Sequence, residues 1–189
     1  MDSSIIITFA IPLFFGLILI EFFYGVITKQ NNYRINDAIT SMSLGLISRF
    51  VPILGLGFQY VVYKAVAEHY NFNLLNGEEV WVWVTAFVLY DVCYYWMHRI
   101  HHEIKVFWAT HVVHHHGEEF NLSTALRQTS TGFLWKWVFF LPMFIIGIPP
   151  HIYVSVAGLN LVYQFWVHTE HIGRLGFFCL LYTSDAADD

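Results

Sequence analysis

The chain has 189 residues, of which 57% are hydrophobic and only 12% are charged, and its formal net charge is −5. Soluble domains carry about 25% charged residues, so this composition excludes an ordinary soluble protein and indicates several membrane spans. Asp185, Asp188 and Asp189 supply three of the negative charges. The rest of the chain is nearly neutral and gives no reason to expect a nucleic-acid partner.

Five apolar segments follow one another, each roughly long enough to cross the ~30 Å hydrocarbon layer of a membrane. They are Ile5–Ile27, Ile39–Ala67, Val80–Met97, Gly132–Ile148 and His151–Val167. The first is not a cleavable signal peptide, because no basic residue precedes it and no small-residue site follows it. Pro149 and Pro150 separate the last two segments, which predicts a tight helical hairpin. We therefore predict an all-α integral membrane protein with four to five transmembrane helices.

Basic residues predict the orientation of these helices. Lys29 and Arg34 lie between the first two segments, and Arg99, Lys105 and Arg127 follow the third. The positive-inside rule then places the N-terminus outside and residues 98–131 in the cytoplasm. The hairpin of the last two segments returns the chain to that same side. The expected architecture is a set of membrane helices under a cytoplasmic, histidine-rich cap.

Seven of the 11 histidines lie between His98 and His116, and histidine is the commonest metal ligand among side chains. Asp91, Tyr95, His98 and His102 are spaced four, three and four residues apart, so a helix places them on one face. An aspartate inside an apolar span is costly unless it is paired. We expect Asp91 to accept a hydrogen bond from the second ring nitrogen of a ligand histidine.

The second histidine group has two interpretations. His111, His114 and His115 share one helix face and are the preferred ligand set, while His111, His115 and His116 form the alternative. His168 is a ligand or a structural residue. His101 and His116 are then spare histidines. Four glutamates are available to accept hydrogen bonds from the ligand histidines: Glu103, Glu118, Glu119 and Glu170. His69 and His151 are expected to be ordinary loop or span-end residues.

So many histidines at one membrane surface favour a particular chemistry. A mononuclear zinc site needs only three or four protein ligands, whereas five or more clustered imidazoles fit two metal ions better. Neutral imidazole suits iron, zinc, copper and nickel. Two irons can activate dioxygen and break an unactivated C–H bond, such as those of lipid chains. A non-catalytic, histidine-rich metal-binding or transport protein is the alternative outside enzymes.

Several motifs together resemble one known family. They are Asp91–His102, Phe107-Trp108, His111–His115 and Asn121–Arg127, and they resemble the fatty acid hydroxylase/sterol desaturase superfamily. Within it, Asn121–Gln128 and Tyr163–Glu170 resemble the alkylglycerol monooxygenase branch. The similarity extends from about Arg34 to Phe178.

The resemblance implies a non-haem centre with two iron ions and oxygen-dependent hydroxylation of a lipid C–H bond, with desaturation on the same site as an alternative. It also implies a lipid substrate and an electron donor, which in the alkylglycerol branch is tetrahydrobiopterin. The positions that match the family's metal ligands are His98, His102, His111, His114, His115 and His168. The catalytic candidates are Asp91 and Asn121.

The resemblance also predicts a third histidine cluster beyond His168, before which this chain stops. Residues 179–189 instead match, codon by codon, the translation of a transposon-based sequencing adapter, and we interpret them as that. The expected organisation is N-terminal transmembrane helices over 1–79, an incomplete hydroxylase-type domain over 80–178, and the adapter. We expect this chain to be inactive and its full-length parent to be an oxygenase. The sequencing origin favours a bacterial plasma membrane over the endoplasmic reticulum.

Overall fold

The computed structural model describes residues 3–51, 58–75, 77 and 79–171, so the expectations for the tail over 179–189 lie outside the described residues. Within these ranges every regular element is a helix, which confirms the all-α prediction. The elements are α1 (Ser3–Thr28), α2 (Ile35–Val51), α3 (Phe58–His69), α4 (Val80–Glu103), α5 (Lys105–His115), the short 3-10 helices η2 (Thr124–Leu126) and η3 (Gly132–Leu134), α6 (Lys136–Ile145) and α7 (Pro150–Phe165).

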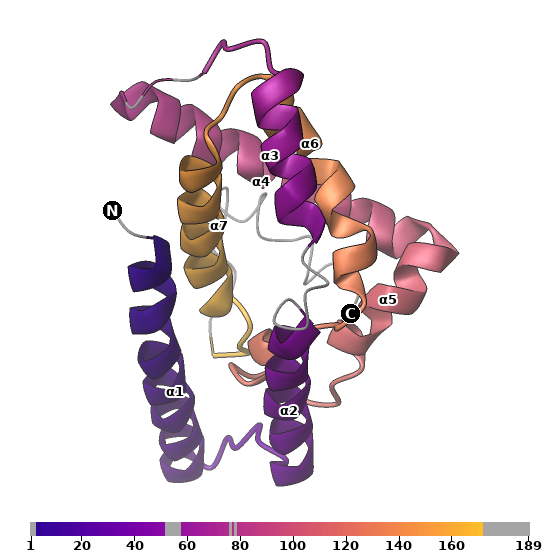
Figure 1. Ribbon diagram of the computed structural model, residues 1–189. Helices are drawn as coiled ribbons and strands as arrows, with labels where there is room; N and C mark the ends of the chain where they lie inside the picture. Colours follow the sequence, from indigo (N-terminus) through magenta and orange to yellow (C-terminus); the bar gives the residue numbers. More distant parts are fainter. Residues whose placement is uncertain (1–2, 52–57, 76, 78, 172–189) are drawn as a thin grey trace.

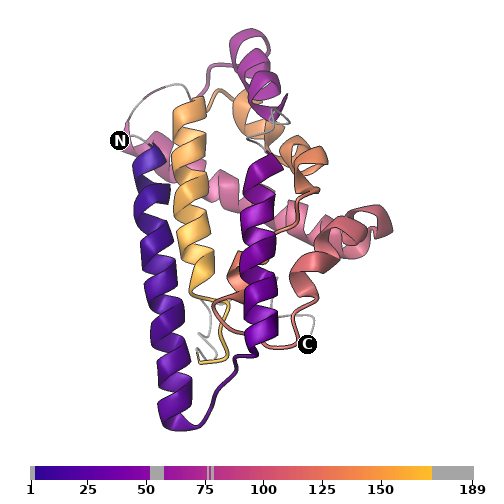
Figure 2. The same ribbon diagram turned by 60° about the horizontal axis from the view of Figure 1, so that its bottom comes forward.

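The helices form one bundle with the histidine-bearing elements on one side. Helix α7 packs along α1 and also contacts α4, which crosses the bundle, while α3 and α6 pair at one end (Figure 1). The second view shows α1, α7 and α2 running in similar directions across α4 (Figure 2). Helix α5 folds back on α4. This arrangement brings residues of α4, α5 and the end of α7 together.

Among the described residues, two helices are long and apolar enough to cross a membrane: Phe9–Thr28 within α1, and α4. The segment expected as one span over Ile39–Ala67 contains two helices, α2 and α3. The segments expected as the fourth and fifth spans contain helices of 10 and 16 residues, shorter than the roughly 20 residues that a span needs. The count of four to five spans therefore stays a prediction.

Two apolar cores hold the described part of the bundle together. The first joins α4, α6 and α7 through Val82, Ala86, Met97, Phe140, Met143, Ile148, Ile152 and Val156. The second joins α1, the η2 segment and α7 through Ala10, Phe14, Ile18, Leu122, Ala125 and Phe165. Phe14 stacks on Phe165 with ring centroids 3.9 Å apart. Because α7 contributes to both cores, it fixes α1 relative to α4.

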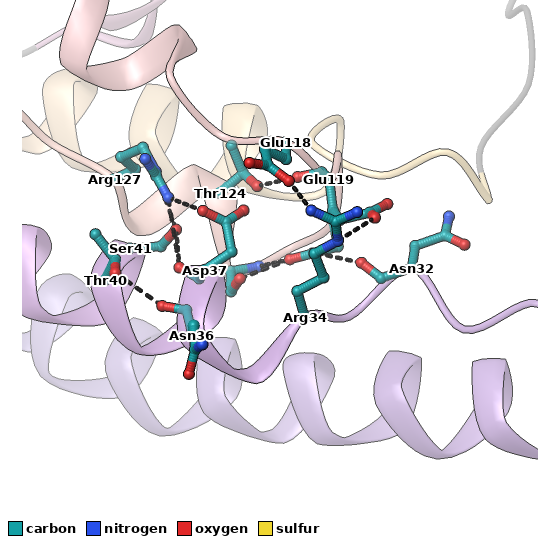
Figure 3. A network of polar contacts seen from close by, with 12 residues as sticks. Asn32, Arg34, Asn36, Asp37, Thr40, Ser41, Glu118, Glu119, Thr124 and Arg127 are labelled. Atoms are coloured by element: carbon teal, nitrogen blue, oxygen red, sulfur yellow. Dashed lines mark hydrogen bonds and ion pairs between the residues drawn. The ribbon is translucent and has the colours of Figure 1, made fainter.

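A polar network ties the start of α2 to the segment after α5 (Figure 3). The Arg127 guanidinium forms a buried ion pair with Asp37 and donates a hydrogen bond to the Ser41 hydroxyl at 3.1 Å. Arg34 pairs with Glu118 and Glu119 at the surface. These contacts join residues about ninety positions apart in sequence, so they set where the loop containing η2 lies.

Helix α1 carries one buried carboxylate, Glu21, which performs a similar task. It accepts hydrogen bonds from the Tyr33 hydroxyl, the Leu122 backbone N–H at 2.8 Å and the Thr169 hydroxyl. A carboxylate within an apolar helix is tolerated where its oxygens are fully hydrogen-bonded. Glu21 thus fastens α1 to the η2 segment and to the chain just after α7.

Candidate metal centre

The first two histidine groups meet because the chain breaks its helix at a single residue. Ile104 has extended backbone angles, φ −107° and ψ 118°, between the end of α4 and the start of α5. The chain therefore reverses sharply, and α5 packs against the last turns of α4. The histidine face of each helix then points at the other.

Four histidines converge in this corner: His98, His102, His111 and His115. One ring nitrogen from each lies within 4.8 Å of those of the other three. The Nε2 atoms of His98 and His102 are 2.8 Å apart, and those of His111 and His115 are 3.1 Å apart. Both pairs are separated by four residues, so helical periodicity supplies each pair and the α4–α5 reversal joins them.

A second, smaller group is formed by His114 and His168. Their Nε2 atoms are 3.3 Å apart, although the residues are 54 positions apart in sequence. Nδ1 of His114 lies 2.9 Å from the Arg127 carbonyl oxygen, and Nδ1 of His168 lies 2.7 Å from the Gln164 carbonyl oxygen. A ring that donates from Nδ1 to a carbonyl presents Nε2 as a potential metal ligand.

The preferred ligand set His111, His114 and His115 is thus divided between two groups. His111 and His115 belong to the four-histidine group, and His114 faces His168. Of the alternative set, His116 is exposed. His101, expected to be spare, is buried instead: its Nδ1 contacts the Met97 carbonyl at 2.7 Å, and its Nε2 has no hydrogen-bond partner within the described part of the chain.

The donor set fits a transition metal ion. His111 is buried, and this burial together with the neighbouring histidines lowers the pKa of its imidazole well below the usual range. The ring is therefore neutral at physiological pH, which is the form that binds metal. An all-imidazole group suits iron, zinc, copper or nickel. The histidine cluster is compatible with iron binding.

Asp91 occupies a different place from the expected one. Its Oδ1 accepts a hydrogen bond from the Asn160 amide at 3.3 Å, and the Asn160 oxygen accepts one from the Gln164 amide at 2.7 Å. Gln164 in turn supplies the carbonyl that contacts His168. Asp91 is therefore linked to a histidine through two amides of α7 rather than directly. Asn160 and Gln164 carry no sequence signal that separates them from other polar residues of an apolar helix.

Asn121, the second catalytic candidate, is buried in the loop before η2. Its amide donates to the Asn32 carbonyl at 2.7 Å, and its oxygen accepts from the backbone N–H and the hydroxyl of Ser123 at 3.0 and 2.6 Å. These contacts hold the loop in shape. The catalytic assignment of Asn121 stays a prediction that its contacts do not favour.

The four glutamates expected to support the ligand histidines lie elsewhere. Glu103 pairs with Arg99 on the surface of α4, Glu118 and Glu119 pair with Arg34, and Glu170 accepts from the Asn32 amide at 2.6 Å. Backbone carbonyls take their place behind His114 and His168. A carbonyl contact depends on chain path, so residue type could not reveal it.

A cavity of about 300 Å³ lies against the histidines. Its inner wall includes His98, His111, His114 and His168. The rest of its lining is mostly apolar and comes from α1, α2, α4, η2 and α7, with Gln128 and Thr129 after η2 and Lys136 at the start of α6. His98 is only 1% exposed. The ring nitrogens therefore lie at the inner end of an apolar space, where they can act on an apolar ligand away from bulk water.

Comparison with known proteins gives a consistent picture. The family model described as fatty acid hydroxylase matches residues 83–188. Alkylglycerol monooxygenase of Danio rerio is 40% identical over 168 residues, covering 88% of this chain and 37% of the relative. The Homo sapiens protein of that name is 39% identical, and the match covers 88% of this chain and 38% of the relative. The Caenorhabditis elegans protein is 30% identical, and the match covers 82% of this chain and 31% of the relative. The chain spans 31–38% of the length of these relatives, and no solved structure matches it.

Proposed function

The chain belongs to the fatty acid hydroxylase family, and from that premise we propose that it carries the metal-binding core of a membrane-bound monooxygenase that hydroxylates a lipid C–H bond. The observation that carries the proposal is the convergence of four histidines beside an apolar cavity. An alkylglycerol is the first substrate to test, because relatives at 39–40% identity are named alkylglycerol monooxygenases. The activity is proposed for a chain that also has the predicted third histidine cluster.

The proposed ligands fall into two sets. His98, His102, His111 and His115 would hold one iron, and His114 and His168 would contribute to a second, together with the third cluster. A pair of irons supplies the dioxygen activation that an unactivated C–H bond requires. The protein's own contribution is to keep the imidazoles neutral, to orient His114 and His168 through backbone carbonyls, and to exclude water from the reacting carbon.

The proposed substrate position follows from the shape of the site. An alkyl chain in the cavity would lie against buried imidazoles, with apolar side chains of α1, α4 and α7 around it. Such a wall binds methylenes and offers few groups to a polar ligand. Electrons would come from tetrahydrobiopterin, as the resemblance implies, or from another donor. Desaturation of the same chain is the alternative enzyme activity.

We also propose the predicted organisation for this 189-residue chain: membrane helices over 1–79, the incomplete hydroxylase-type domain over 80–178, and adapter translation over 179–189. Basic residues next to the proposed spans support a cytoplasmic histidine cap. The relatives compared above come from animals and lend no support to the expected bacterial membrane.

The decisive experiment uses the full-length parent, purified in detergent and loaded with iron. With an alkylglycerol and tetrahydrobiopterin, we expect oxygen consumption and a product that has gained one oxygen atom; loss of two hydrogens instead would identify a desaturase. His115→Ala should abolish both, whereas His69→Ala should leave both intact, because His69 is exposed on α3. Iron that exchanges freely, with no oxygen consumed, would replace the enzyme proposal with metal binding alone.

A further inference from the structure

The cavity beside the histidines opens through a defined mouth. Ile11 and Phe15 of α1 and Leu46 of α2 all line the cavity, yet they are 51%, 46% and 62% exposed. Of the histidines that line it, His98, His111 and His168 are nearly fully buried, and His114 is partly buried. Residues that line a cavity and are half exposed mark where it meets the outside, so the mouth lies between α1 and α2.

The surface around the mouth is apolar on both helices. Leu13 and Leu19 of α1 and Ile39, Ile47 and Phe50 of α2 are all at least half exposed. Large continuous apolar surface marks a contact with a membrane or a partner. The stretch Phe9–Thr28 of α1 is also one of the two helices long and apolar enough to cross a membrane. The surface around the mouth is therefore suited to contact with the hydrocarbon of a bilayer.

Polarity changes along the cavity. None of the three mouth residues carries a polar group, whereas Gln128, Lys136 and Gln164 line the cavity together with the histidines. The wall also includes Phe14, Met42 and Phe165. Ile11 and Phe15 are four residues apart and so lie on one face of α1, toward the cavity. The part of a ligand that occupies the mouth is therefore expected to be apolar.

We propose that one alkyl chain of a membrane lipid reaches the histidines sideways from the bilayer, through the mouth formed by Ile11, Phe15 and Leu46. This proposal deepens the proposed function and rests on it for the reaction, but the binding of the chain does not require the reaction. The occupant is a hydrocarbon chain, because the mouth offers it only apolar contacts, from two aliphatic side chains and the Phe15 ring. A lipid extracted into water would have no advantage at this opening.

The experiment uses the full-length protein in lipid nanodiscs and a hexadecanol that carries a diazirine near the end of its chain. After illumination, peptide mass spectrometry should find the label on cavity residues such as Phe14, Met97 or Phe165. Leu46→Trp places an indole in the mouth and should lower this labelling by roughly an order of magnitude. Ile47→Trp is the matched control: Ile47 is 50% exposed on the same helix and does not line the cavity.

A second pair of variants covers the case in which a tryptophan prevents folding. Leu46→Cys and Ile47→Cys are purified folded and then modified with a benzyl thiosulfonate, and the native cysteines are common to both. We expect modification at 46, and not at 47, to block labelling of the cavity. Equal effects at the two positions, or label spread evenly over the outer faces of α1 and α2, would overturn the proposal.

Metal content and product formation are measured on the same samples. Cavity labelling that depends on Leu46, without any hydroxylated lipid, would leave lateral access standing and remove the proposed reaction. Equal amounts of hydroxylated lipid from Leu46→Trp and Ile47→Trp would leave the proposed reaction standing and would overturn access through the mouth. Iron content should be equal in both variants, because neither residue contacts a histidine of the metal centre.

Discussion

The backbone carbonyl oxygen of Arg127 lies 2.9 Å from Nδ1 of His114. The guanidinium of the same arginine is buried against Asp37 at the start of α2. A ring of the candidate metal centre is therefore oriented by a loop that an ion pair with a distant helix holds in place. Breaking this ion pair should disturb the orientation of the His114 ring without removing a candidate metal ligand.

We expect Asp37→Ala to lower the free energy of unfolding by about 3–5 kcal/mol, because it leaves the Arg127 charge buried without a partner. The side chains of Arg127 and Asp37 are 3% and 17% exposed. Thermal unfolding in detergent measures the loss. The control is Glu68→Ala, which breaks the exposed Lys64–Glu68 pair and should change stability by less than about 1 kcal/mol. Equal losses would contradict the structural role of the Asp37 pair.

The two histidine groups should separate in metal binding. With cobalt(II) as a spectroscopic probe, we expect His115→Ala to remove the ion bound by the four-histidine group. His114→Ala should leave that ion in place, because the His114 ring faces His168. Absorption titration of the ligand-field bands measures both effects, with His69→Ala as the unaffected control. If His114→Ala abolished the cobalt signal, the helix-face set of His111, His114 and His115 would be the correct one.

Glu21 should matter more than any one of its donors. Glu21→Ala leaves two hydroxyls and a buried backbone N–H without their acceptor, at a cost of about 1–3 kcal/mol for each buried group left unsatisfied. Tyr33→Phe removes one donor and leaves the carboxylate with two. Burial and the adjacent Glu21 raise the pKa of the Tyr33 phenol, so it remains a donor at physiological pH. Unfolding curves should therefore give Glu21→Ala a much lower free energy of unfolding than Tyr33→Phe. The opposite order would contradict the anchoring of α1 by Glu21.

Gly45 permits the close approach of α2 to η2. A Cβ at Gly45 would clash with the Leu126 backbone oxygen, whereas one at Gly16 in α1 would have nothing within 4 Å. We expect Gly45→Ala to lower the melting temperature, because backbone atoms would have to move. Gly16→Ala should leave it unchanged or raise it, since alanine favours a helix by about 0.5–1 kcal/mol over glycine. Similar melting temperatures for the two variants would show that α2 can shift freely.

Much of the metal centre could be read from spacing alone. Pairs of histidines four residues apart, His98 with His102 and His111 with His115, meet because a helix repeats every 3.6 residues. The choice between His114 and His116 as the further ligand could not be made in this way. It depends on which side of α5 faces α7, and His114 faces His168 only after the bundle has formed.

The roles of the carboxylates were the least predictable. Asp91 was expected to support a histidine directly, yet it accepts its hydrogen bond from Asn160, whose oxygen accepts one from Gln164. Glu118 and Glu119 were expected near the ligands but pair with Arg34 instead. Long side chains choose partners within a few ångströms of their tips, and the distance between Arg34 and Glu118 is set by how the α1–α2 linker meets the loop after α5.

The sequence by itself determined that the protein is helical and apolar, that its histidines lie in two groups at the end of α4 and on α5, and which family its motifs resemble. These properties depend on composition and on neighbours within one helix. Only the tertiary structure decided that the two groups form one four-histidine corner, that His101 is buried, and that an apolar cavity joins the histidines to the outer surface of α1 and α2. Each of these depends on the angles between helices, which the reversal at Ile104, the two apolar cores and the buried Arg127–Asp37 pair fix together.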